Sequence, residues 1–285
     1  MKRFLLTVFI ALAGLTLSGQ STGFISIQQL IQQQQIKVEL KGLGGYTGEC
    51  VEITIENLTP VDQQVLLEAG RRLDNTNPKQ QDILVVREKQ LIVNAGKSFT
   101  FNAYGFCCQA SNGSPSTNVK FDIGTMASGN LLWIAQYFNK YPYQYNESLM
   151  QTAVWIFSDN RNVASILAQR DSNAAKLRRD MATQLGIEYP WYDIYYETDT
   201  AMVATHRHYN LQGPVTYRLP NRGWMEMVVR DPHKRMIHKF TERSFVEGGT
   251  YTYQVDLNVK GWIKGKYEIE IYLDDILKKK YAFIL

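Results

Sequence analysis

Hydrophobic residues in the first third of the chain alternate with polar ones in short runs. Residues 36–40 and 51–55 place every second side chain on one face, and compact apolar runs follow at 83–86 and 91–93. Turn residues separate these runs, and none of the runs shows the 3.6-residue period of a helix. Short strands at this spacing predict a β-sandwich domain over residues 36–125.

The middle of the chain changes to helical spacing. Apolar residues recur every three or four positions over 129–139 and 149–157. Asn146 can cap the second of these helices, and Asp171 can cap a third. The pattern predicts a helical segment over residues 126–186, which is too small to form a bundle by itself and is expected to pack on the first sandwich.

Strand-like alternation returns after residue 213. Six alternating segments separated by turns predict a second, antiparallel β-sandwich over residues 214–285. The stretch 187–213 is rich in aromatic residues and has no period, which predicts a linker. The whole pattern predicts a mainly β protein, with two β-sandwich domains and a small α-helical segment inserted between them.

The first residues have the layout of a secretory signal peptide. Lys2 and Arg3 precede an apolar run that ends in small residues, so we expect a signal peptide over 1–19. The apolar run is shorter than the roughly 20 residues that a membrane-spanning helix needs, and no later segment is long enough. We therefore expect an exported protein without a transmembrane span, in the periplasm, on the outer-membrane surface or secreted. The Gln-rich stretch 20–35 predicts a mobile arm.

Composition and charge narrow the function classes. The 285 residues are 45% hydrophobic, which excludes a disordered chain. The net charge of +4 falls further when the signal peptide is removed, so nothing indicates a nucleic-acid partner. No nucleophile motif or phosphate-binding loop is present, and no cofactor is indicated. His206 and His208 could share one face of an extended segment, but a surface strand is the simpler interpretation and we expect no metal site.

The three cysteines allow at most one internal disulfide in an oxidising compartment. Strand alternation places Cys50 outward, Cys107 inward and Cys108 outward. This parity favours a Cys50–Cys108 disulfide with Cys107 buried. A pairing of Cys50 with Cys107 stays open, because the alternation can slip at Gly105.

The C-terminal module resembles a known family. The motifs that carry the resemblance are VTYRLP (215–220), GWMEMVVRD (223–231), GGTY (248–251), GKY (265–267) and the final KKKYAFIL (278–285). In this order they resemble the Ig-like C-terminal module of exported Bacteroidetes proteins, which is related to the flagellar hook-capping fold. Some modules of that family are type IX secretion sorting signals, and others are only structural. The resemblance covers about a quarter of the chain and implies an Ig-like β-sandwich.

Residues 106–155 resemble bacterial thioester adhesin domains. Phe106-Cys107 and the helical motif from Gln151 to Trp155 match their paired aromatic-Cys and Gln motifs. The resemblance implies a covalent link between Cys107 and Gln151 that is shielded from water until an amine arrives. The alternative is a buried thiol and a helix glutamine that hydrogen-bonds a loop backbone.

Aromatic residues gather in two patches, and Tyr141, Tyr143, Trp191 and Tyr192 are the candidate binding residues. Exposed, such rings suit a protein or glycan ligand; buried, they would join the helices and the linker to the sandwiches, which we expect for most of them. The leading hypothesis is an exported, non-enzymatic envelope or cell-surface protein that acts as a binding or structural module, with an envelope protein or a surface glycan as partner. The alternatives are a covalent thioester adhesin and a carbohydrate-binding or carbohydrate-active protein.

Overall fold

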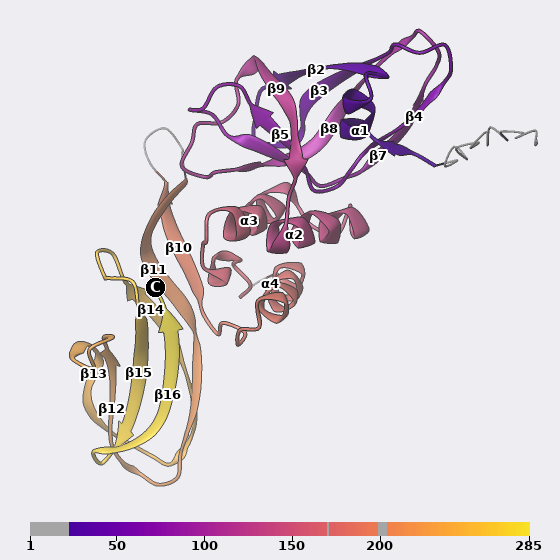
Figure 1. Cartoon of the computed structure of the whole chain (residues 1–285). Coiled ribbons are helices and arrows are strands. Elements are labelled where there is room, and N and C mark those ends of the chain that lie inside the picture. Colours follow the sequence, from indigo (N-terminus) through magenta and orange to yellow (C-terminus); the bar gives the residue numbers. More distant parts are fainter. Residues whose placement is uncertain (1–22, 170, 199–203) are drawn as a thin grey trace, which may run out of the picture.

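A computed structural model describes residues 23–169, 171–198 and 204–285 of the chain, so the predicted signal peptide at 1–19 lies outside the described residues. The described chain is mainly β, as predicted, and the helices α2, α3 and α4 lie between two β-rich parts (Figure 1). Within these ranges, no helix combines the length and the apolar character that crossing a bilayer requires.

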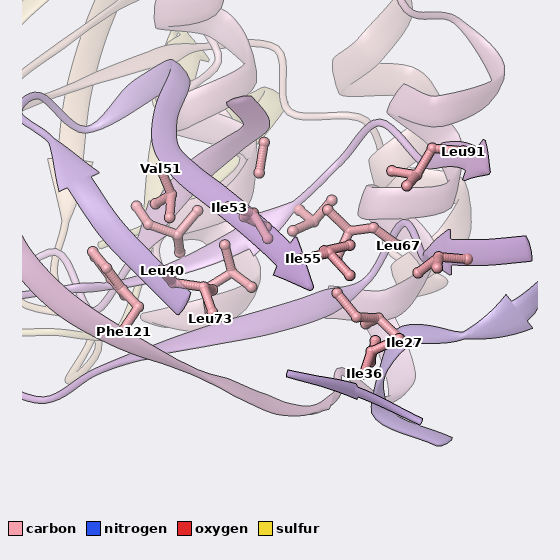
Figure 2. Close-up of a cluster of buried hydrophobic side chains, with 14 of the residues drawn as sticks. Ile27, Ile36, Leu40, Val51, Ile53, Ile55, Leu67, Leu73, Leu91 and Phe121 are labelled. Carbon is pink, nitrogen blue, oxygen red and sulfur yellow. The ribbon is translucent and has the colours of Figure 1, made fainter. Parts of the chain in front are cut away.

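The N-terminal domain contains a closed barrel. Its elements are β1 (Ile25–Ser26), α1 (Ile27–Gln32), β2 (Ile36–Leu43), β3 (Thr47–Asn57), β4 (Gln63–Leu67), β5 (Arg71–Asn75), β6 (Asp82–Val85), β7 (Lys89–Val93), β8 (Ser98–Cys108) and β9 (Thr117–Met126). Six strands close in the order β2-β3-β8-β6-β5-β9, and β1-β4-β7 form a small separate sheet. Side chains from several strands, among them Leu40, Ile53 and Phe121, converge in the core of this domain (Figure 2).

Barrel closure uses the alternation that the sequence shows, because a barrel and a sandwich both bury every second side chain. The closing contacts are between distant strands: β9 pairs with both β5 and β2. Close approach also matters where β8 pairs with β6. A Cβ atom at Gly105 would lie 2.7 Å from the carbonyl oxygen of Leu84, so only glycine allows the two strands to pack this closely.

The prediction of a mobile Gln-rich arm over 20–35 is wrong for its described part. Residues Ile27–Gln32 form α1, and Ile27 and Leu30 are completely buried. These two side chains belong to the same buried cluster as the barrel residues. Figure 2 shows Ile27 in this cluster. Two apolar residues three positions apart are thus enough to fix the short helix, since tertiary burial, not helix propensity, stabilises a segment of this length.

The helical segment follows the predicted pattern. It contains α2 (Gly129–Lys140), α3 (Glu147–Ser158), the 3-10 turn η1 (Val163–Ser165) and α4 (Ser172–Leu185). Asn146 accepts the backbone N–H of Leu149, and Asp171 accepts the N–H groups of Asn173 and Ala174, so both predicted N-caps are confirmed. The α3 helix packs on β8, and Phe106 and Cys108 of that strand share a buried cluster with the helices.

The C-terminal part is a two-sheet β-sandwich. Its strands are β10 (Asp193–Thr198), β11 (Ala204–Leu219), β12 (Gly223–Arg230), β13 (Met236–Val246), β14 (Gly249–Asn258), β15 (Lys266–Leu273) and β16 (Ile276–Ile284). One sheet has the order β10-β11-β14 and the other the order β13-β12-β15-β16. Tyr267, Ile269 and Phe283 are buried in its core.

The predicted linker over 187–213 is wrong, because most of it belongs to this sandwich. β10 occupies part of the stretch, and β11 begins at Ala204 and pairs with β14 as far as Leu219. The β10–β11 pairing shifts register on both sides of Tyr196. Such bulges interrupt the two-residue period, so the alternation that reveals the other strands is missing here.

Candidate functional site

The cysteines do not form the predicted disulfide. All three thiols are free and buried. Cys107 faces the barrel core and Cys108 faces the helices, as parity predicts, but Cys50 also lies in the barrel core. The reason is a β-bulge between Glu49 and Val51, which turns two consecutive residues inward. Cys50 and Cys108 therefore lie in different cores.

Burial makes these thiols poor nucleophiles. Desolvation raises the pKa of Cys50 and of Cys108 to about 12, and it also raises the pKa of Cys107. The thiolate is the reactive form of cysteine, so the raised pKa and the burial of these side chains both disfavour their reaction at neutral pH.

The structure brings the two thioester candidates together, but through the backbone of Cys107. Gln151 Oε1 accepts the Cys107 N–H at 3.1 Å, and Gln151 Nε2 donates to the Cys107 carbonyl oxygen at 2.8 Å. Gln151 is buried on α3, outside the barrel, whereas Cys107 belongs to the buried cluster inside it. The carboxamide is thus engaged with main-chain groups. This arrangement matches the alternative of a helix glutamine that hydrogen-bonds the backbone.

Trp191 and Tyr192 hold the last strand in place. The indole N–H of Trp191 donates to the Ala282 carbonyl oxygen at 2.7 Å. The Tyr192 hydroxyl accepts the Ile284 N–H at 2.9 Å and donates to the Ile284 carbonyl oxygen at 3.2 Å. Both residues therefore join β16 to the segment before β10, which is the structural role expected for most of the aromatics.

A buried ion pair connects the helices to the sandwich. Arg178 on α4 and Asp193 on β10 are both buried, and their side chains form a salt bridge. Asp193 also accepts the backbone N–H of Ala168 at 3.0 Å. The Arg178 guanidinium further donates to main-chain carbonyl oxygens of Ala164, Ile166, Pro190 and Tyr192. Both terminal nitrogens of the buried guanidinium are thus engaged with the protein itself, which makes this a structural arrangement.

The described residues that best suit a ligand line a groove between α2 and α4. The groove has a volume of about 520 Å³, within the usual range for ligand sites. We call it the aromatic groove and define it by six of its lining residues: Trp133, Gln136, Tyr137, Tyr141, Asp180 and Gln184. Tyr141 is one of the predicted binding residues. Trp133, Tyr137 and Tyr141 stand at four-residue intervals, and this spacing is the sequence signal that indicates the other two rings.

The rings of the groove form one strip. The ring centroids of Trp133 and Tyr137 are 5.1 Å apart, and those of Tyr137 and Tyr141 are 5.0 Å apart. All three side chains are half-buried, so each is supported from below and still reaches the surface. Trp133 also packs edge-on against Phe157 of α3, with centroids 5.9 Å apart. The strip is therefore rigid, which lowers the entropic cost of binding.

The polar side of the groove is held by Asp180. Its carboxylate accepts the Tyr137 hydroxyl and the Lys176 ammonium, both at 2.6 Å. Burial alone would raise the pKa of Asp180, but the hydrogen bonds from Lys176 and Tyr137 lower it below its usual value. The same carboxylate raises the pKa of Lys176. The pair is thus charged and mutually neutralised at physiological pH.

Tyr143 lies outside the groove and is almost fully exposed, at 88%. Its ring receives the guanidinium of Arg87 with 4.9 Å to the centroid, and Arg87 also covers Tyr104 at 3.5 Å. The cation holds the loop between α2 and α3 against the barrel.

His206 and His208 both lie on β11. His208 Nε2 lies 3.1 Å from the Trp262 carbonyl oxygen, and His206 is exposed. In the part of the chain that the structure describes, no three side chains of the metal-binding types come close enough together to hold an ion.

No protein-family model matches the chain, and a comparison with curated proteins finds none that is significantly similar in sequence.

Proposed function

We propose that this protein is an exported, non-enzymatic binding protein of the cell envelope or cell surface, and that it binds its ligand through the aromatic groove. The observation that carries the proposal is the strip of Trp133, Tyr137 and Tyr141, rigid and open on one side. Rigid aromatic rings that are half-buried are typical of residues that dominate binding energy.

Export rests on the pattern of residues 1–19, a basic start followed by an apolar run and small residues. The resemblance of the C-terminal module to a sorting domain agrees with delivery to the cell surface. An enzymatic role has less support: the buried thiols have raised pKa values, and the carboxylates of the groove and of the salt bridges are paired with cations.

The proposal is tested by sedimentation of the purified protein with the isolated envelope of the organism's own cells. Wild-type protein should bind saturably, and Trp133→Ala should weaken the binding at least about tenfold, the effect of truncating a central anchor. Trp224→Ala is the matched control, since Trp224 is 49% exposed on β12 of the sandwich. Its binding should stay within about twofold of wild type.

Circular dichroism should first show that both variants are folded. Absence of saturable wild-type binding would overturn the proposed function. Equal loss in both variants, or loss in Trp224→Ala alone, would overturn the assignment of the site.

A further inference from the structure

We propose that the ligand of the aromatic groove is an uncharged oligosaccharide segment, whose sugar rings stack on the strip formed by Trp133, Tyr137 and Tyr141. The inference rests on the proposed function and specifies the chemical class of its ligand.

The ring spacing suits a chain of small flat units. Residues four apart on a helix are separated by about 6 Å along its axis, and the centroids of neighbouring rings in the strip are 5.0–5.1 Å apart. A pyranose ring has an apolar face of C–H groups and hydroxyls around its edge. Neighbouring rings are tilted by 33° and 56°, and Lys176 lies 5.4 Å from the Tyr141 ring centre, so the strip is stepped. A sugar ring can stack on Trp133 at the end of the strip, and the next ring of the oligosaccharide then lies against the tyrosines.

The polar side chains beside the strip can hydrogen-bond the hydroxyl groups at the edge of a sugar ring. Gln136 on α2 is exposed, and its side chain has no hydrogen bond to any residue in the described ranges. Gln184 on α4 donates to Asn130 Oδ1 at 3.0 Å, which leaves its own amide oxygen open to a hydroxyl donor. An amide offers both donors and acceptors, and a hydroxyl needs both.

The charge of the groove argues for an uncharged ligand. Asp180 and Lys176 neutralise each other at 2.6 Å. Lys140, which also lines the groove 5.4 Å from the Tyr141 ring centre, has no ion pair with any described residue and is a single unpaired cation. A phosphate or polyanion site would need several unpaired cations in convergent positions. The groove is also lined by ring faces and polar side chains instead of a deep apolar pocket, which a protein anchor residue would need.

A hollow on the C-terminal sandwich is a weaker candidate. It is lined by Tyr196, Glu197, Tyr209, Asn258 and Lys260. Glu197 is paired with Arg207 and with Lys260, both at 2.8 Å, so its polar groups are already engaged. Its two tyrosines are not in ring contact with each other. It therefore lacks a continuous strip.

Mild periodate oxidation of the envelope tests the class of ligand, because periodate cleaves the vicinal diols of sugars and leaves the polypeptide backbone intact. Envelope treated in this way should bind wild-type protein at least about tenfold more weakly than untreated envelope. Unchanged binding to oxidised envelope would overturn the oligosaccharide, while saturable binding to untreated envelope that depends on Trp133 would keep the proposed binding function.

A second arm treats the envelope with proteinase K to distinguish two sources of the sugar. Binding that survives the protease and is lost after periodate identifies a polysaccharide or glycolipid; loss after either treatment identifies a glycan carried on protein. Both outcomes support the oligosaccharide. Binding that is lost after protease and survives periodate overturns it in favour of a polypeptide.

A substitution tests stacking directly. Trp133→Phe keeps a flat ring in the strip and should bind untreated envelope within about fivefold of wild type, whereas Trp133→Ala should lose at least about tenfold. Equal loss in two folded variants would overturn stacking on this ring.

Discussion

The Gln151 carboxamide supplements the strand pairing beside Cys107. β3 pairs with β8 up to Phe106, the Cys107 N–H is shared between the Tyr46 carbonyl oxygen and Gln151 Oε1, and Gln151 Nε2 donates to the Cys107 carbonyl oxygen. A buried N–H or C=O without a partner costs about 1–3 kcal/mol. The glutamine therefore fixes the position of α3 on the barrel.

We expect Gln151→Ala to lower the free energy of unfolding by about 1–3 kcal/mol, because it removes a buried side chain and the donor to the Cys107 carbonyl oxygen, while the Cys107 N–H keeps its bond to the Tyr46 carbonyl oxygen. Chemical denaturation measures this. Gln136→Ala on α2 is the control and should change the stability by less than about 0.5 kcal/mol, since that side chain is exposed. A loss below about 0.5 kcal/mol in Gln151→Ala would contradict the role of the glutamine.

The engagement of Gln151 also predicts the covalent state of the protein. The mass of the intact chain should be that of free thiols and should not change with methylamine, because the carboxamide faces the Cys107 main chain. Iodoacetamide should modify the three cysteines only after denaturation, since burial raises their pKa values. A mass gain with methylamine would instead establish the thioester, and a Cys50–Cys108 peptide would restore the parity pairing.

At the scale of single elements, a charged network holds the edge of the C-terminal sandwich. Glu270 on β15 is buried and accepts hydrogen bonds from Arg230 at 2.5 Å and from Tyr272 at 2.6 Å, and Lys280 lies 2.7 Å away. Burial alone would raise the pKa of Glu270, but these three partners outweigh it and lower the pKa to about 2. The network joins β12, β15 and β16.

A folded-state pKa below the ordinary value means that ionised Glu270 stabilises the fold. This contribution, at most about 3 kcal/mol, is complete above roughly pH 5 and is lost as the pH falls towards 2. Glu270→Gln should therefore unfold more easily at pH 7 and show a flatter loss of stability between pH 5 and 2. Thermal denaturation across this range measures both effects. Glu242→Gln, at a side chain 93% exposed, is the control and should keep the wild-type slope. A wild-type slope in Glu270→Gln would contradict the network.

The sequence predicts an element well when the residues that determine it are close together in the chain. Asn146 and Asp171 begin helices because a cap depends on the next three residues. Parity fails at Cys50 because a single bulge reverses the facing of the residues on one side of it, here those before Val51. The sequence pattern does not predict the first half of β11. This segment is a strand because it pairs with β10 and β14, and its own residues do not alternate regularly. Only one side of the candidate site can be predicted from the sequence. The spacing of its three aromatic rings is a local feature of one helix, whereas the position of α4 opposite them depends on the tertiary fold.

At the scale of the whole molecule, Arg178 and Asp193 couple the helical segment to the sandwich. Removing one partner of a buried ion pair leaves the other charge uncompensated, which costs about 3–5 kcal/mol. Asp193→Ala should therefore separate the unfolding of the two parts into distinct calorimetric transitions. Glu39→Ala, which breaks an exposed pair with Lys37, should leave the wild-type profile. A wild-type profile in Asp193→Ala would contradict the coupling.

Two exposed aromatic surfaces are candidates for the binding face, and an oxidative footprinting experiment distinguishes them. The aromatic groove lies between α2 and α4, whereas Trp224 and Phe245 form an exposed pair on the C-terminal sandwich, with ring centroids 5.6 Å apart. Hydroxyl-radical oxidation followed by mass spectrometry, with and without saturating envelope, reports which rings the ligand covers. We expect the ligand to protect Trp133, Tyr137 and Tyr141 from oxidation and to leave Trp224 and Phe245 unprotected. Protection of Trp224 and Phe245 with the groove rings unchanged would contradict it.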